Sequence, residues 1–418
     1  MSAAAGKERG ALRIILAERS VAAVIALALF INLGTGIVLP ILPLYARSLG
    51  ADYGQTGLMV GAYYFARLMS DIAAGAVLRR LGVRRAAAAG LSLLAIGALL
   101  TGLSPSFPIA LICWAGAGAG GGTVFAAMYN ALILGVAKER MARALSLFYG
   151  AFNGGVVAGG FLGGVVAGRF GLNVPLFCLA AIAAGLAAVM LRMLVESPHP
   201  ALPQGGRETV PRGRETALRG TENSVRALFR IRGFGGSVIS VLANLWMFGA
   251  VFNTLVPLFA RDVLHLSTFG IGVLYAVSLA AEFAVYYPAG KWADSRGRRF
   301  VLIPAFALLA VATMILGWSP TVITFALVMA LLGVASGFAG VPPAAMLADV
   351  LPEHESARGV ATFRFGADLG YTLGPLVAGL TAASVGFKAA FITAGLPSVI
   401  ALVVVTRGRE TLPRSQTA

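Results

Sequence analysis

The sequence has little charge, little cysteine and little histidine. Charged residues make up 12% of its 418 residues, about half the share usual in soluble domains. Its two cysteines, Cys113 and Cys178, both lie inside apolar runs, which excludes a disulfide framework. Its three histidines are scattered between such runs and predict no metal site. These deficits argue against an ordinary soluble enzyme, a disulfide-rich protein and a metalloprotein.

Nucleotide-binding and catalytic motifs are also missing. The chain contains no G-x-x-x-x-G-K-[ST] loop, so ATP binding is not expected. A G-x-G-x-x-G match at residues 116–121 lies within a long apolar run instead of a strand–turn–helix, and close helix packing explains it better. No Ser-His-Asp or Cys-His set can be assembled. We therefore expect no cofactor, no metal and no enzyme activity.

Apolar residues dominate the chain. The set AVILMFWYC accounts for 58% of it, and the mean hydropathy is +0.85. A helix needs about 20 mostly apolar residues to cross a bilayer. Long runs poor in charge, two of them divided by turn signals at 104–108 and 317–320, predict twelve spans. The spans are expected at 20–46, 55–78, two within 86–137, 144–168, 173–195, 234–260, 266–290, two within 300–348, 359–384 and 389–406.

Basic residues predict the orientation of these spans. The net charge is +16, from 33 basic and 17 acidic residues. With the N-terminus in the cytoplasm, 27 basic residues fall on the inner side and four, Arg47, Arg169, Arg261 and Lys388, on the outer side. This asymmetry predicts a multi-pass protein of the cell inner membrane with both termini cytoplasmic. The dispersal of the basic residues predicts the lipid bilayer as their partner and no nucleic acid.

The two halves of the sequence match when shifted by about 215 residues. Six spans per copy keep the repeat parallel, so we expect two six-helix bundles, at 20–195 and 233–406. The rest is an N-terminal tail at 1–19, a basic linker at 196–232 and a C-terminal tail at 407–418. The linker repeats Gly-Arg-Glu-Thr at 206–209 and 213–216, and the tail echoes it at 408–411. A solvated basic loop is expected there, with a partner-binding site as the alternative.

Two glycine- and arginine-rich loops follow the second and eighth spans. They read GAVLRRLGVRR at 75–85 and GKWADSRGRR at 290–299. This pattern resembles the G-x-x-x-D-R-x-G-R-R loop of the major facilitator superfamily, and the first span resembles that of its bacterial efflux members. The resemblance implies an all-α polytopic membrane protein with twelve transmembrane helices in two six-helix halves. It also implies a cytoplasmic latch, with Arg79 replacing the acid in the first loop. The latch residues are Gly75, Arg79, Arg80, Gly82, Arg84, Gly290, Asp294, Gly297 and Arg299.

Five ionisable residues lie within spans, where an unpaired charge costs several kcal/mol. They are Arg67, Asp71, Glu282, Arg364 and Asp368. The two Arg–Asp pairs each have i, i+4 spacing, which places both members on one helix face. In the functional interpretation, Glu282 or Asp368 takes up a proton while an arginine adjusts its proton affinity or binds an anionic group. In the alternative, the pairs are neutral ion pairs that join helices.

Further polar and aromatic residues in the spans are candidates for a substrate cavity. They are Asn32, Tyr63, Trp114, Asn130, Asn153, Trp246, Asn253, Tyr275 and Tyr371. Single polar residues in spans often serve instead to join helices.

Together these features predict a monomeric secondary transporter that works by alternating access on a small-molecule substrate. The first hypothesis is proton-coupled export of a small, partly apolar compound, such as a drug or metabolite. Export follows from the resemblance of the first span, and the proton as coupling ion follows from Glu282 and Asp368. The alternatives are an uptake permease for a small organic anion and a non-transporting membrane sensor or scaffold.

Overall fold

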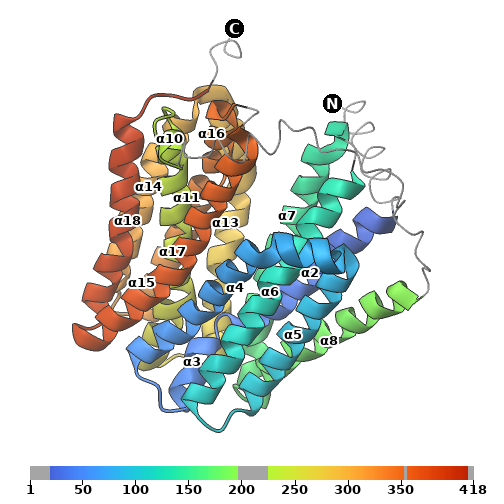
Figure 1. The fold of residues 1–418 in the computed structure, drawn as a ribbon. Helices are drawn as coiled ribbons and strands as arrows, with labels where there is room; N and C mark the ends of the chain where they lie inside the picture. The colour runs from blue at the N-terminus through green and yellow to red at the C-terminus, as the bar shows by residue number, and fades with distance from the viewer. Residues whose placement is uncertain (1–18, 137, 196–224, 353–354, 413–418) are drawn as a thin grey trace, which may run out of the picture.

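The computed structural model of the chain describes residues 19–136, 138–195, 225–352 and 355–412, and within these ranges it contains helices but no strand (Figure 1). The linker repeats at 206–209 and 213–216 lie outside the described residues, as does most of the N-terminal tail. Figure 1 shows two bundles of helices, one blue to green and the other yellow to red.

The first bundle comes from the N-terminal half of the chain. Its helices are α2 (Arg19–Val38), α3 (Leu42–Ser48), α4 (Tyr53–Leu81), α5 (Val83–Leu103), α6 (Phe107–Gly135), α7 (Lys138–Phe170) and α8 (Val174–Val195). The first predicted span is divided by a turn at 39–41, and Pro43 stands in the first turn of α3. Asp52 accepts from the backbone N–H of Gln55 and begins α4 with a capping box.

The second bundle repeats this plan. It contains α10 (Val225–Leu228), α11 (Phe234–Met247), η1 (Phe248–Leu255), α12 (Val256–Asp262), α13 (Thr268–Arg296), α14 (Arg298–Leu316), α15 (Val322–Gly340), α16 (Pro342–Val350), α17 (Ser356–Ser384) and α18 (Phe387–Arg407). The segments α11, η1 and α12 form one continuous membrane-spanning helix. Its middle part, η1, is a π-helix, a rare form that often occurs at functional sites.

Ten crossings in the described ranges are long and apolar enough to span a membrane by length and composition. The other two are α4 and α17, each 29 residues long. These two helices carry the Arg–Asp pairs, which lower their hydropathy without shortening them.

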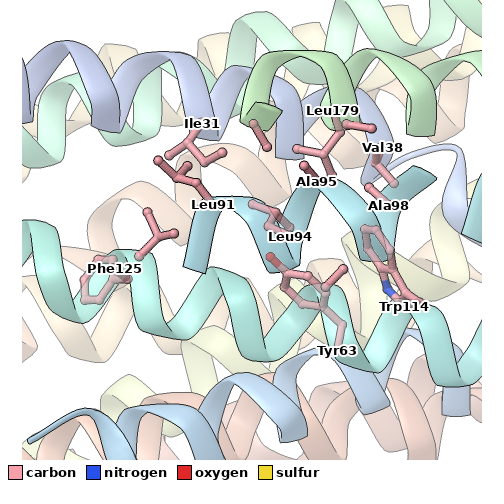
Figure 2. Packing of buried hydrophobic residues seen from close by; sticks show 14 of the residues in the cluster. Ile31, Val38, Tyr63, Leu91, Leu94, Ala95, Ala98, Trp114, Phe125 and Leu179 are labelled. Carbon is pink, nitrogen blue, oxygen red and sulfur yellow. The ribbon is translucent and has the colours of Figure 1, made fainter. Parts of the chain in front are cut away.

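The same helix pairs form in both bundles. In the first, α2 packs on α7, α4 on α6 and α5 on α8; in the second, α11 packs on α17, α13 on α15 and α14 on α18. Each pair therefore has its counterpart six crossings later, as a parallel repeat requires. Each bundle also has its own apolar core, and Figure 2 shows part of the first, with Leu91 and Leu94 of α5 lying between α2 and α6.

The bundles meet along two helix pairs, α4 with α17 and α7 with α13. Glycines allow both contacts. A Cβ on Gly57 would collide with the carbonyl of Pro375, and one on Gly164 would lie 2.7 Å from Cα of Gly272. Both glycines lie toward the end of the molecule that carries α3.

Toward the opposite end, α7 and α13 separate. Gly160 still contacts Tyr275, whereas a Cβ on Gly150 or Gly154 would find nothing within 4 Å. Figure 1 likewise shows the start of α7 standing apart from α16. The bundles are thus closed together at one end and apart at the other.

Candidate functional site

The intramembrane charges gather where α4 and α17 meet. These helices run antiparallel. Tyr64 lies against Tyr371 and, about two turns further along, Arg364 lies 3.7 Å from the carboxylate of Asp71. Arg67 and Asp368, between those two levels, are close enough for their charges to interact. The i, i+4 spacing suggests pairs along one helix. In the structure the ion pair joins Arg364 to Asp71 of the other bundle, while Arg67 lies near both Asp71 of its own helix and Asp368 across the interface. We call these four residues the charge crossing.

Aromatic rings of α6 support the two arginines. The guanidinium carbon of Arg67 lies 5.1 Å from the ring centre of Phe125, and that of Arg364 lies 4.7 Å from the same ring. Arg364 also lies 5.2 Å from the ring of Tyr129. Cation–π contacts of this kind stabilise a cation that has lost much of its water. Neither Phe125 nor Tyr129 could be predicted as part of the site, because an aromatic residue in an apolar run ordinarily belongs to the core.

Glu282 lies in a separate polar cluster inside the second bundle. Its side chain is 3% exposed, and its Oε1 accepts from the hydroxyls of Tyr286 at 2.8 Å and Ser336 at 3.3 Å. The Ser336 hydroxyl also lies 3.5 Å from Oδ1 of Asn244, so α11, α13 and α15 all contribute. Within the described part of the chain, Oε2 has no hydrogen-bond partner. A buried carboxylate with a free oxygen can accept a proton without breaking an existing contact.

Between the charge crossing and the closed end lies a layer of aromatic residues. Tyr64 stacks on Tyr371 across the two bundles at 4.4 Å, and Asn253 in η1 donates to the Tyr64 hydroxyl at 3.1 Å. Tyr63 stacks on Trp114 at 4.8 Å, and Figure 2 shows the two side by side at the edge of the core. A cavity of about 10 Å³ remains among them, room for one water. Two of these contacts, Tyr64 with Tyr371 and Tyr64 with Asn253, join the two bundles.

The other cavity candidates are distributed differently. Asn32 and Asn130 donate to carbonyls of their own helices, at Ala28 and Ala126. The Tyr275 hydroxyl donates to the carbonyl of Phe252. Two further candidates, Asn153 and Trp246, are partly exposed, and the indole nitrogen of Trp246 is buried without a partner among the described residues.

The two latch loops differ in their contacts. In the first, Arg79, Arg80 and Arg84 are exposed, and Gly82 has φ +77°. A Cβ on Gly75 would meet only the side chain of Arg79.

In the second loop, Arg298 lies between Asp294 and Asp349, and its Nε is 3.1 Å from Asp349. The Arg299 side chain donates to the carbonyls of Val405 and Thr406. A Cβ on Gly290 would only touch Val341. Asp349 lies in the last turn of α16, beside this loop.

Glu410, in the tail after α18, caps this second loop. Its carboxylate accepts from the backbone N–H groups of Arg298 at 2.9 Å and Arg299 at 3.1 Å, the first residues of α14. Gly297 precedes them with φ +105°, a conformation that favours glycine, and a side chain there would strike Glu410. Partial burial raises the pKa of Glu410, but hydrogen bonds from four backbone N–H groups outweigh it and lower the pKa overall.

A family model described as Major Facilitator Superfamily matches residues 24–286 and 239–418. Curated relatives include two proteins named multidrug resistance protein MdtG. The one from Enterobacter lignolyticus is 28% identical over 151 residues, covering 34% of this chain and 36% of the relative. The one from Citrobacter koseri is 29% identical over 171 residues, covering 39% and 42%. The matched stretch thus spans about two fifths of these relatives' length.

Solved structures share the fold over nearly the whole chain. A D-xylose–proton symporter superposes with a TM-score of 0.75 at 14% identity, covering 97% of this chain and 99% of that one. A bacterial homolog of the human lysosomal transporter Spinster, in an inward-facing and unoccupied conformation, gives 0.74 at 14% identity, covering 93% and 95%. The prediction of twelve helices in two six-helix halves is confirmed.

Proposed function

This chain belongs to the Major Facilitator Superfamily, and from that membership we propose that it exports a small, partly apolar compound in exchange for protons. Transport of a small molecule across a membrane is the activity of the family. The direction of export is supported by the relatives named as multidrug resistance proteins, and by the first span, which resembles that of efflux members.

The observation that carries proton coupling is the charge crossing between the bundles. The halves must move relative to each other for the transporter to open at its closed end, and the Asp71–Arg364 ion pair, which joins α4 to α17, opposes a change in their arrangement. A proton on Asp368 removes one negative charge from the crossing and weakens its hold on Arg67. Proton binding and the opening of the transporter are thereby linked.

Glu282 is a second acidic residue that can bind the coupled proton. It sits on α13, which forms the other contact between the bundles with α7, and its free oxygen can receive a proton. An ionised carboxylate at this depth costs several kcal/mol, and a bound proton removes that cost.

The predicted inner-membrane location and cytoplasmic termini complete the proposal. The closed end, with α3 and the start of α13, then faces outward, and the two latch loops face the cytoplasm. In that orientation, the separation of α7 from α13 near Gly154 corresponds to an inward-facing arrangement. We further propose that the protein functions as a monomer.

The first experiment is expression of the wild type and Asp368→Asn in a bacterial host that lacks its own exporters. We expect the wild type to raise resistance to some compounds of a broad toxic panel, and Asp368→Asn to lose that resistance. Glu355→Gln is the matched control, because Glu355 pairs with Arg358 at the start of α17, outside the crossing. Equal sensitivity with and without the wild-type protein, at equal membrane abundance, would refute export.

A second experiment separates proton coupling from substrate binding. In proteoliposomes, Glu282→Gln should abolish transport driven by a pH gradient while substrate exchange without a gradient continues. Loss of both activities would instead give Glu282 a structural role.

One observation favours a second function, the uptake of a small organic anion. Arg67 and Arg364 come from different bundles, and the guanidinium groups of both lie near the ring of Phe125. Two guanidinium groups placed together can bind a carboxylate. In that case the wild type would sensitise the host to toxic anions, and Arg67 and Arg364 would be the residues to substitute next.

A further inference from the structure

Basic residues are rare on the side of the protein that carries α3, and most of them share one cavity. The sequence places four there, Arg47, Arg169, Arg261 and Lys388. The first three line a surface cavity of about 950 Å³, whereas Lys388 does not. A concentration of this kind is unexpected on the side that the positive-inside rule depletes of arginine.

The cavity lies between the two bundles. Arg47 comes from α3 and Arg169 from the end of α7, both in the first bundle, while Arg261 comes from α12 in the second. All three side chains are exposed to the cavity and the surface. A ligand held by all three therefore contacts both halves of the transporter at their closed end.

The charge of the cavity lining is not balanced by protein. Asp262 is the one acidic residue of the lining, and it already accepts from the Tyr53 hydroxyl at 2.8 Å and lies 4.0 Å from Arg47. Arg261 makes a long contact, 3.4 Å, to the carbonyl of Leu266. Among the described residues, no carboxylate forms an ion pair with Arg169 or Arg261. The lining keeps a net charge of two positive, which suits an anion.

The rest of the lining is apolar. Leu44, Val165 and Leu172 contribute to the wall, and the Phe269 ring is 51% exposed at its edge. A small soluble anion would use the arginines and leave this surface bare to water. A molecule with an anionic head and a hydrocarbon tail uses both parts.

We propose that this cavity binds the headgroup of an anionic phospholipid from the outer leaflet. The phosphate lies between Arg169 and Arg261, and an acyl chain follows Phe269 and Val165. Because these arginines belong to different bundles, the lipid stabilises the arrangement in which the outer end is closed. The proposal takes from the proposed function only the orientation of the chain, and it does not depend on the transported compound.

Lipid retention tests this directly. The full-length protein is reconstituted in nanodiscs with equal amounts of phosphatidylcholine and phosphatidylglycerol, then released into mild detergent, and bound lipid is identified by native mass spectrometry. We expect the wild type to retain phosphatidylglycerol, with about a five-fold loss for Arg169→Gln or Arg261→Gln and roughly 25-fold for the double variant. No transport assay enters this measurement, so failure of the export proposal leaves it unaffected.

Lys388→Gln is the matched control. Lys388 lies at the start of α18, on the same side of the protein, with its Nζ 6.0 Å from the ring centre of Trp318. Its substitution by glutamine removes one positive charge, as each single arginine substitution does. We expect it to retain phosphatidylglycerol like the wild type, and Arg169→Lys to retain more than Arg169→Gln. Equal retention by the Lys388 and double-arginine variants would overturn the site. Displacement of the lipid by dilute inorganic phosphate would overturn the lipid assignment in favour of a soluble anion.

Discussion

One ion pair within the described spans joins the two bundles. Asp71 of α4 pairs with Arg364 of α17, and neither oxygen of Asp71 has a hydrogen-bond partner among the described residues. The pair is therefore held by charge and by the rings of Phe125 and Tyr129 on α6. Such a pair can separate without leaving behind a hydrogen bond that must be replaced.

Removing one partner should harm the protein more than removing both. Asp71→Asn or Arg364→Gln each leaves a charge in a poorly hydrated site, at a cost of about 1–3 kcal/mol. The double variant removes both charges, so we expect its thermal stability in detergent to exceed that of either single variant. Additive losses in this double-mutant cycle would show that the two side chains do not interact in the membrane.

At the scale of helices, the start of α14 is capped by a residue far along the chain. Glu410 caps the first turn of α14 more than 100 residues after it. Its lowered pKa means that the folded protein favours the ionised carboxylate. The stabilisation is then present above the pKa of an unfolded glutamate, and it is lost as the pH falls through the lower pKa of the folded state.

Glu410→Gln should therefore remove a pH-dependent part of the stability. At neutral pH we expect a loss of about 1 kcal/mol, typical of a helix N-cap, and a smaller difference from wild type below the pKa of Glu410. Thermal unfolding of both proteins across acidic pH measures this. Arg409→Gln, at an exposed neighbouring position, serves as the control, and a constant difference at every pH would contradict the cap.

Helix positions could be predicted from the sequence because span length and turn residues are local properties. The break between α5 and α6 contains Ser104 and Pro105, and the break between α14 and α15 contains Pro320, as predicted. The π-helix η1 carries no such signal. Partners on different helices carry no local signal either. The i, i+4 spacing of Arg67 and Asp71 is compatible with a pair on one helix and equally with pairing to a residue on another helix. The cluster of Tyr286 and Ser336 around Glu282 likewise depends on how helices pack.

For the whole molecule, the contact between α7 and α13 sets which end is closed. Gly164→Ala should push these helices apart, because its methyl would meet the backbone of Thr268 and Gly272. Gly154→Ala on the same helix is the matched control, since open space surrounds that position. We expect Gly164→Ala alone to shift the protein toward an outward-open state.

The shift can be measured with a single cysteine. Cys113 and Cys178 are first replaced by alanine, and Leu44→Cys then reports access from outside, because Leu44 of α3 is buried against the core of the second bundle at the closed end. Labelling by a membrane-impermeant maleimide should rise several-fold with Gly164→Ala and stay unchanged with Gly154→Ala. An equal effect of both alanines would contradict a closed end held by glycine contacts.

The antiparallel match of α4 with α17 also limits how the halves can move. If one helix slid past the other by a single turn, about 5.4 Å, Arg67 would lie opposite Arg364 instead of Asp368, and like charges would oppose each other in a poorly hydrated layer. Tilting the two helices about the level of these four charges does not bring the two arginines opposite each other. The four charges therefore oppose sliding of one half past the other more strongly than tilting, which only has to lengthen the Asp71–Arg364 contact.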